Sequence, residues 1–256
     1  MNVLMLGDVV GQGGCEAVRS HLPGLKQYYA TDLVIINGEN SAQGNGILPS
    51  SAKFLFDSGV DVITTGNHVY RRREIYEMLE RKEALIRPAN FSPENPGVGV
   101  YILDMLRYRV AIVNLLGTAG MEPLANPFDT IDSILKVLDT PNIILDFHAE
   151  TTSEKRAMGF YVDGRISLFA GTHTHVQTAD EQILPQGTGY ITDLGMCGPK
   201  QSVLGVKPEQ VIARFRTAMP TRFENPEGEQ IICGIIADID ERTGKTRQIE
   251  RIYRFI

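Results

Sequence analysis

The sequence predicts an α/β fold in a single domain that spans residues 1–256. Short apolar runs alternate along the chain with stretches typical of helices, which favours a mostly parallel sheet with crossover helices. No internal repeat, low-complexity tract or long linker divides the chain. Hydrophobic residues make up 43% of the 256 residues, so one large core can be buried.

Short apolar runs that end in glycine or polar residues mark the expected strands. The runs at 98–103 and 109–115 flank a short loop and predict adjacent antiparallel strands, and residues 182–192 predict a hairpin-like pair. The expected strands are 2–6, 32–36, 60–64, 98–103, 109–115, 142–147, 166–170, 231–240 and 247–255.

Helices are expected between these strands. Pro49 and the serines after it suit the first turn of a helix, and Pro208 marks the start of another. Pro23 is expected to disturb the first helix, because proline cannot donate a backbone hydrogen bond. The expected helices are 14–21, 48–56, 72–79, 130–138 and a segment from about residue 208.

The composition favours a cytoplasmic protein with no membrane partner. No apolar run approaches the ~18–20 residues that span a bilayer, and the N-terminus lacks the regions of a signal peptide. Cys15, Cys197 and Cys233 are far apart and form no C-x-x-C pair, so we expect reduced thiols.

The net charge of −6 argues against a surface built to coat long nucleic acid, because phosphate contacts need clustered Lys and Arg. A small phosphate substrate remains compatible, since bound cations can supply positive charge. The run Arg71-Arg72-Arg73 has two interpretations: a solvated first helical turn, or attraction of an anionic substrate.

Side chains suited to metal binding follow five strand-like runs, at the point where each run ends. Four of the five histidines belong to this set, and only His21 does not. Because the carboxyl ends of parallel strands meet at one edge of a sheet, we expect these side chains to converge. His173 and His175 form an i, i+2 pair, which on extended backbone directs both rings to one side. The set is Asp8, Glu39, Asn40, Asn67, His68, His148, His173 and His175.

Taken singly, these residues also have ordinary roles. Asp8 suits a turn or a helix cap, Asn67 can stabilise a turn, and His148 suits a hydrogen-bonded core position. Their common position at strand ends is what favours a shared metal site.

The donor set indicates two transition-metal ions. Two carboxylates, two amide oxygens and three imidazoles, with no thiolate, suit Mn, Fe or Zn better than a structural zinc site. Seven donors are too many for one ion and suit two that share a bridging carboxylate, for which Glu39 is our choice. Two ions about 3.5–4 Å apart can lower the pKa of a bridging water and hold the oxygens of an in-line displacement.

The segments that contain these residues resemble the calcineurin-like metallophosphoesterases, and more narrowly their YmdB-like branch. The resemblance runs nearly end to end and includes residues 146–150, 172–180 and 190–199. It implies a four-layer α-β-β-α sandwich with mixed sheets, a dinuclear iron or manganese site, and phosphodiesterase activity on 2′,3′-cyclic nucleotides. The motifs that carry it are Gly7-Asp8, Gly38-Glu39-Asn40, Gly66-Asn67-His68, His148 and Gly171-Thr172-His173-Thr174-His175.

The resemblance also implies a role for each residue. A metal-bridging hydroxide would attack phosphorus, and His68 would be the general acid for the leaving oxygen. One ion would be held by Asp8, Glu39, Asn40 and His175, and the other by Glu39, Asn67, His148 and His173.

Three positions depart from the broader superfamily. Val10 stands where its Asp-x-His motif has histidine, and Glu39 replaces the bridging aspartate; both changes are shared with the YmdB-like branch. Val69 follows His68 in place of an acid, which leaves the group that orients His68 unidentified.

Ligand histidines usually donate their second ring N–H to a carboxylate or carbonyl. Glu150 and Asp193 are candidates for this, with an ordinary loop role as the alternative. Residues 115–121 and 195–205 could frame the pocket or contact another subunit.

Two other function classes fit part of the sequence. The glycines at 7, 11, 13 and 14 suggest a dinucleotide-dependent oxidoreductase, but their spacing is not G-x-G-x-x-G. The other class is a regulatory protein that binds a nucleotide at the metal site with little turnover. The substrate stays open among small phosphodiesters, cyclic nucleotides and RNA ends, and a homo-oligomer is compatible with the sequence.

Overall fold

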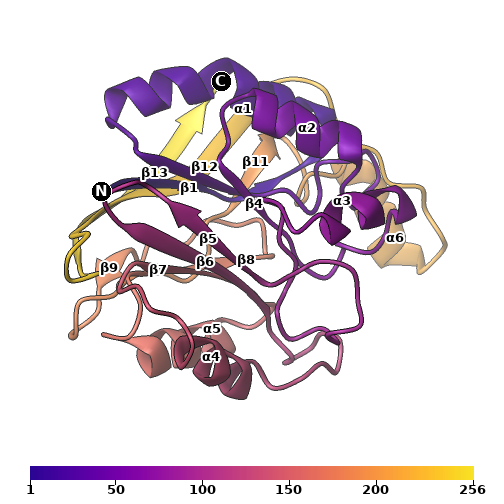
Figure 1. Ribbon diagram of the computed structural model, residues 1–256. Coiled ribbons are helices and arrows are strands. Elements are labelled where there is room, and N and C mark those ends of the chain that lie inside the picture. Colours follow the sequence, from indigo (N-terminus) through magenta and orange to yellow (C-terminus); the bar gives the residue numbers. More distant parts are fainter.

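Two mixed β-sheets pack face to face between two layers of helices (Figure 1). The computed structural model describes all residues from Met1 to Ile256. This arrangement confirms the α/β class and the four-layer α-β-β-α order that the sequence predicts. No helix is long and apolar enough to cross a membrane.

The first sheet contains the strands β1 (Asn2–Leu6), β2 (Asp8–Val9), β3 (Leu33–Asn37), β4 (Val62–Thr64), β11 (Met196–Pro199), β12 (Gln230–Ile239) and β13 (Thr246–Phe255). Their order is β2-β11-β12-β1-β3-β4, with β13 paired to β12. β1 runs parallel to β3 and antiparallel to β12, so the sheet is mixed.

The second sheet contains β5 (Val100–Asp104), β6 (Arg109–Leu116), β7 (Ile143–His148), β8 (Leu168–Thr172), β9 (Gln182–Ile183) and β10 (Gly189–Ile191), in the order β5-β6-β7-β8-β10-β9. The pairs β5/β6 and β9/β10 are antiparallel, as the sequence predicts. The central strands β6, β7, β8 and β10 are parallel, so their carboxyl ends lie at one edge.

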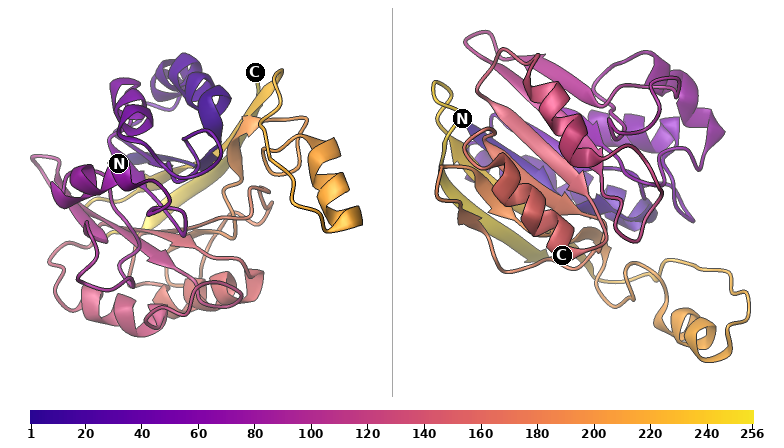
Figure 2. Two further views of the ribbon diagram at one scale, coloured as in Figure 1. Left: turned by 90° about the vertical axis from the view of Figure 1, so that its right-hand side faces the viewer. Right: turned by 90° about the horizontal axis from the view of Figure 1, so that it is seen from below.

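Helices cover the outer face of each sheet. α1 (Gly11–Tyr28), α2 (Pro49–Asp57), the 3-10 turn η1 (Arg73–Ile75) and α3 (Tyr76–Glu80) lie on the side of the first sheet, and α4 (Pro127–Leu135) and α5 (Thr152–Val162) cover the second. α6 (Pro208–Thr217) stands apart from both layers and projects from the sandwich (Figure 2).

Three hydrophobic clusters fill the three interfaces between the layers. In β1, Leu4 and Leu6 face the helices, whereas Val3 and Met5 face the second sheet. This alternation is the period of two that a strand buried on both faces imposes. A third cluster, which includes Phe147 and Phe169, joins the second sheet to α4 and α5.

The first helix is longer than expected, and the predicted end near residue 21 is wrong. α1 continues through Pro23 to Tyr28. Leu22 is fully buried and Leu25 packs against the same core, so this contact with the sheet outweighs the hydrogen bond lost at the proline.

Other boundaries also differ from the prediction. α4 begins at Pro127, because the side chain of Asn126 caps its N-terminus. The helix expected at 72–79 is a 3-10 turn followed by the short α3.

The sequence does not predict α5. Thr151 caps this helix by accepting a hydrogen bond from the backbone N–H of Glu154.

Two of the glycines before and within α1, Gly7 and Gly14, allow close contacts between backbone segments. A Cβ at Gly14 would lie 2.3 Å from the carbonyl oxygen of Cys197, so glycine lets α1 approach β11. β11 lies in the stretch 195–205, for which the sequence predicts neither a strand nor a helix. These glycines therefore have a structural explanation independent of dinucleotide binding.

Candidate active site and metal centre

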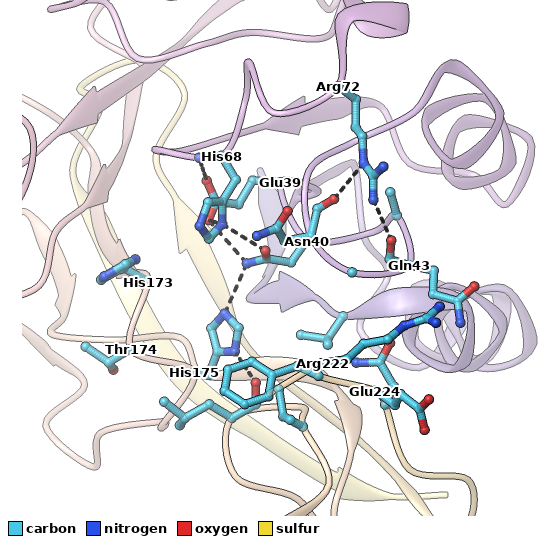
Figure 3. A pocket seen from close by; sticks show the side chains of 18 of the residues that line it. Glu39, Asn40, Gln43, His68, Arg72, His173, Thr174, His175, Arg222 and Glu224 are labelled. Carbon is cyan, nitrogen blue, oxygen red and sulfur yellow. Dashed lines mark hydrogen bonds and ion pairs between the residues drawn. The ribbon is translucent and has the colours of Figure 1, made fainter. Parts of the chain in front are cut away.

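The eight predicted site residues lie together at the strand ends of the two sheets. Figure 3 shows five of them, Glu39, Asn40, His68, His173 and His175. Asp8 opens β2, and His148 is the last residue of β7. The side chains of Asp8, Glu39 and His148 are fully buried, whereas His68, His173 and His175 line a pocket. His21, the one histidine outside the predicted set, lies on α1, where its Nδ1 is 3.2 Å from the carbonyl oxygen of Ala17.

One group of donor atoms surrounds Nε2 of His148. This nitrogen lies 3.3 Å from Oε1 of Glu39, 3.1 Å from Oδ1 of Asn67 and 3.0 Å from Nδ1 of His173. Ligand atoms of Glu39, His148 and His173 all lie within 4.8 Å of one another. Two imidazole nitrogens at such a distance need a proton or a cation between them, so this group has the chemistry of a metal site.

A second group surrounds Nε2 of His175. It lies 3.6 Å from Oδ1 of Asp8 and 3.2 Å from Nδ2 of Asn40. Nδ2 of Asn40 is also 3.2 Å from Oε1 of Glu39, so Glu39 adjoins both groups. The nitrogen and oxygen of an amide exchange places in a 180° flip, and a ligand role for Asn40 requires the flipped amide.

The three histidines predicted as metal ligands keep one ring nitrogen directed into the site, because an oxygen holds the other. Nε2 of His173 lies 2.9 Å from Oε2 of Glu150, as expected for a supporting carboxylate. Nδ1 of His175 lies 3.0 Å from the carbonyl oxygen of Leu204. Nδ1 of His148 lies 2.9 Å from Oγ1 of Thr172. A second N–H bound in this way is typical of histidines that ligate metal.

Oδ1 of Asp8 gives an independent test of whether a cation fits. This oxygen is buried and has no hydrogen-bond partner. Buried carboxylate oxygens are rarely left unpaired, because the charge loses its hydration without compensation. A cation beside Asp8 and His175 would satisfy it, so the residues present fit a metal ion.

A buried network behind His148 fixes its proton. Thr172 donates its hydroxyl proton to Oδ1 of Asp146 at 2.6 Å, so its oxygen accepts from Nδ1–H of His148. In the neutral ring the lone pair then lies on Nε2, directed toward the site. Asn37 donates to Oδ2 of Asp146 and accepts from the backbone N–H of Glu39. Burial raises the pKa of Asp146 to about 6, against the lowering effect of these partners.

Asn37 and Asp146 are site residues that the strand-end pattern does not indicate. Asn37 ends an otherwise apolar buried strand, and Asp146 interrupts the apolar run of another. A polar residue in such a strand needs a buried partner, and that signal could have found both.

Charges within the site stabilise one another. Burial opposes ionisation of Glu39, but His148 and His68 hold its pKa well below the usual value. Burial likewise disfavours a charged His148, but Glu39, Asp8 and Asp146 outweigh it and raise its pKa to about 9.

The loop that carries His173 and His175 is not extended, so that part of the prediction is wrong. β8 ends at Thr172, and both histidines have positive φ angles, 102° for His173 and 64° for His175. The two rings consequently face different donor groups. Such backbone is strained for non-glycine residues and persists only where other contacts hold it.

Asp193 supplies those contacts and does not touch a histidine ring. Its Oδ2 accepts from the backbone N–H and the hydroxyl of Thr174, which lies between the two histidines. The same oxygen forms a buried ion pair of 2.6 Å with Nζ of Lys155. Its other oxygen accepts from the N–H of Gly195.

The structure answers the question of what orients His68. Its Nδ1 lies 3.0 Å from Oδ1 of Asn40 and 3.0 Å from Oε1 of Glu39. Its backbone N–H donates to Oε2 of Glu39. A Cβ at Gly66 would lie 2.3 Å from the ring of His148, so only glycine allows this segment to approach the site.

A pocket of about 720 Å³ opens from these residues. One side carries Arg72, whose guanidinium donates to the backbone carbonyls of Asn45 and Gln43. The opposite side is formed by 204–206 and 222–225. Arg71 and Arg73 do not line the pocket, so only the middle residue of the arginine run faces it.

A smaller pocket lies beside Asn67 and His173. Its other lining residues are Gly120, Met121 and Glu122. They lie in or next to the stretch 115–121, for which the sequence allowed either a place at the pocket or a contact with another subunit. The loop that follows β11 contributes Leu204 to the larger pocket. Both stretches therefore frame the site.

Comparison with known proteins agrees with this geometry. The pattern of the YmdB-like protein family matches residues 4–252. The chain belongs to this family. A 2′,3′-cyclic-nucleotide 2′-phosphodiesterase from Bacillus subtilis is 45% identical over 254 residues, which cover 98% of this chain and 96% of that protein. The family assignment made from the motifs is thus confirmed.

Solved structures extend the comparison to the fold. A phosphatase from Mycoplasma pneumoniae is 37% identical with a TM-score of 0.95, and the match covers 100% of this chain and 93% of that one. A candidate 5′-nucleotidase from Staphylococcus aureus is 15% identical with a TM-score of 0.61, and the match covers 98% of this chain and 54% of that one. At that identity the likeness concerns the fold alone.

Proposed function

We propose that this YmdB-like protein is a dinuclear metal-dependent phosphodiesterase that hydrolyses small phosphodiesters, with 2′,3′-cyclic nucleotides as the leading substrates. The observation that carries the proposal is the convergence of five strand ends on two donor groups that adjoin Glu39. The activity named for the Bacillus subtilis relative supports the choice of substrate.

The proposed ligand sets follow the two donor groups. Asp8, Asn40 and His175 would hold one ion, Asn67, His148 and His173 would hold the other, and Glu39 would contact both. Iron or manganese suits these oxygen and nitrogen donors best, and zinc also fits. Two such ions activate a water and neutralise charge that develops on the phosphoryl group.

His68 is the proposed general acid. For this role the ring would carry both protons: Nδ1–H would be held by Oε1 of Glu39 at 3.0 Å, and Nε2–H would be the proton available to the leaving oxygen.

Arg72 would favour an anionic substrate at the pocket. Its guanidinium is engaged with backbone carbonyls and not with a carboxylate, so its positive charge is not neutralised there. This supports the attraction of substrate that the sequence offered as one interpretation of the arginine run.

The proposal is tested by purifying the protein without chelators, counting bound metals per chain and assaying the same sample. The assay uses 2′,3′-cyclic AMP and bis-p-nitrophenyl phosphate, with Asn67→Ala as the comparison variant. We expect about two transition-metal ions per chain, many turnovers per site, and loss of turnover in Asn67→Ala.

Two outcomes would reject the proposal. Bound metals with at most one product per site on both compounds would favour a regulatory nucleotide-binding protein. No metal, and none regained after addition of manganese or iron, would reject the metal centre itself. The cytoplasmic location, RNA ends as further substrates and a homo-oligomer stay predictions.

A further inference from the structure

The pocket extends well beyond the proposed metal ligands. Its volume of about 720 Å³ lies in the range of pockets that enclose a whole nucleotide-sized ligand, about 300–1,000 Å³, and exceeds what a phosphate alone needs. The side remote from the strand ends must therefore face the part of a substrate that carries no phosphate.

That remote side carries apolar residues beside charged ones and contains one aromatic ring. Phe223 lines the pocket and is 45% exposed, although it is a large hydrophobic residue. Leu204 and Val206 lie on the same side of the pocket. Figure 3 shows the neighbours of Phe223, Arg222 and Glu224, on the side of His175, across from Arg72 and His68.

Hydrogen bonds hold the segment of Phe223 in place. Glu224, the next residue, donates its backbone N–H to Gln210 and accepts from the backbone N–H of Lys207. Asn225 donates to the carbonyl oxygen of Gly205 at 2.8 Å. The adjacent carbonyl of Leu204 accepts from His175, so the aromatic side of the pocket is tied directly to the proposed metal site.

We propose that Phe223 stacks on the nucleobase of the substrate, so that the pocket selects diesters that carry a base over diesters that do not. This inference rests on the proposed phosphodiesterase function and names its substrate class. Stacking on an aromatic ring tolerates every base, because each base has a π-face. Phe223 is therefore a specificity residue for the nucleoside, with no part in the chemical step.

The test compares Phe223→Ala with Phe223→Tyr and Phe215→Ala in the metal-loaded protein. Phe215 lies on α6, is 85% exposed and does not line the pocket, so it is a matched control. Substrates are 2′,3′-cyclic AMP and the cyclic phosphate of 1-O-methylribose, which has no base. Binding of adenosine 3′-phosphate is measured on the same samples by calorimetry.

We expect Phe223→Ala to raise KM for 2′,3′-cyclic AMP by about tenfold and to weaken adenosine 3′-phosphate binding similarly. Its kcat, and all constants for the base-free substrate, should stay close to those of the parent protein. Phe223→Tyr should restore the parent values, and Phe215→Ala should not change them. Equal changes on both substrates, or no change on either, would overturn the inference.

Failure of this inference is distinguishable from failure of the proposed function. Turnover of both substrates without discrimination by Phe223 would leave the phosphodiesterase standing and remove the base contact. Absence of turnover, together with adenosine 3′-phosphate binding that Phe223→Ala weakens, would reject the phosphodiesterase and retain the base contact.

Discussion

The two sides of the pocket are built in different ways. On the inner side, the proposed ligands follow strands of the two sheets, and Asp8, Glu39 and His148 are fully buried. On the outer side, Leu204 and Phe223 belong to the projecting segment around α6 and stay half exposed. The inner side is fixed by the sheets, whereas the outer side depends on a few hydrogen bonds such as that from Asn225 to Gly205.

This contrast separates the proposed chemistry from the proposed choice of substrate. Residues that must keep fixed distances lie where two sheets and their helices constrain them. Residues that contact the variable part of a substrate lie on a connection that can change without disturbing either sheet. We therefore expect changes on the inner side to affect metal binding and kcat, and changes on the outer side to affect KM.

The largest effect is expected on the inner side, from His173→Ala. Turnover should fall by more than about 100-fold, because loss of a residue that only supports a metal ligand already costs about 10- to 100-fold. Metal analysis and steady-state kinetics on the same sample test this. His21→Ala, a histidine on α1, should leave both unchanged. Full metal content and activity in His173→Ala would contradict the metal-binding role of the inner side.

An intermediate effect concerns stability. Asp193→Asn leaves Lys155 as an unpaired buried charge, which typically costs about 3–5 kcal/mol. For a chain of this size the melting temperature should fall by about 10 °C. On the outer side, Glu224→Gln breaks the exposed pair with Lys207 and should leave the melting temperature nearly unchanged. Equal melting temperatures in the two variants would contradict the difference in rigidity.

The smallest effect is expected on the outer side, from Arg222→Ala. Arg222 lines the pocket, so its loss should raise KM for an anionic substrate by about threefold at low salt and less at high salt. Arg216→Ala removes an exposed arginine of α6 that does not line the pocket and is the control. A change in kcat, or no dependence on salt, would contradict a purely electrostatic role.

The same contrast governs what the sequence could predict. Strand ends on the inner side can be predicted from local patterns. An apolar run followed by histidine, aspartate or asparagine can be recognised in the sequence before the fold is known. β1 has the bounds that the sequence predicts, and the eight residues that the patterns select lie together. Helix ends were less predictable, since the contact of Leu22 with the sheet carries α1 through Pro23.

The outer side could not be predicted in this way. Phe223 is one aromatic residue in an irregular segment, and nothing nearby in the sequence indicates that it faces a pocket. Its place depends on contacts with Gly205 and Gln210, which lie 20 and 14 positions from their partners Asn225 and Glu224. Asn37 and Asp146 could be predicted in part. The sequence shows that they are polar residues in apolar strands, but it does not show which residues they contact.

The central claim is that the strand ends hold two metal ions that share Glu39. Anomalous diffraction from crystals of the manganese-loaded protein tests it most directly. The account predicts two peaks about 3.5–4 Å apart, one beside Asp8 and His175 and the other beside His148 and His173. A single peak, or peaks remote from Glu39, would contradict it.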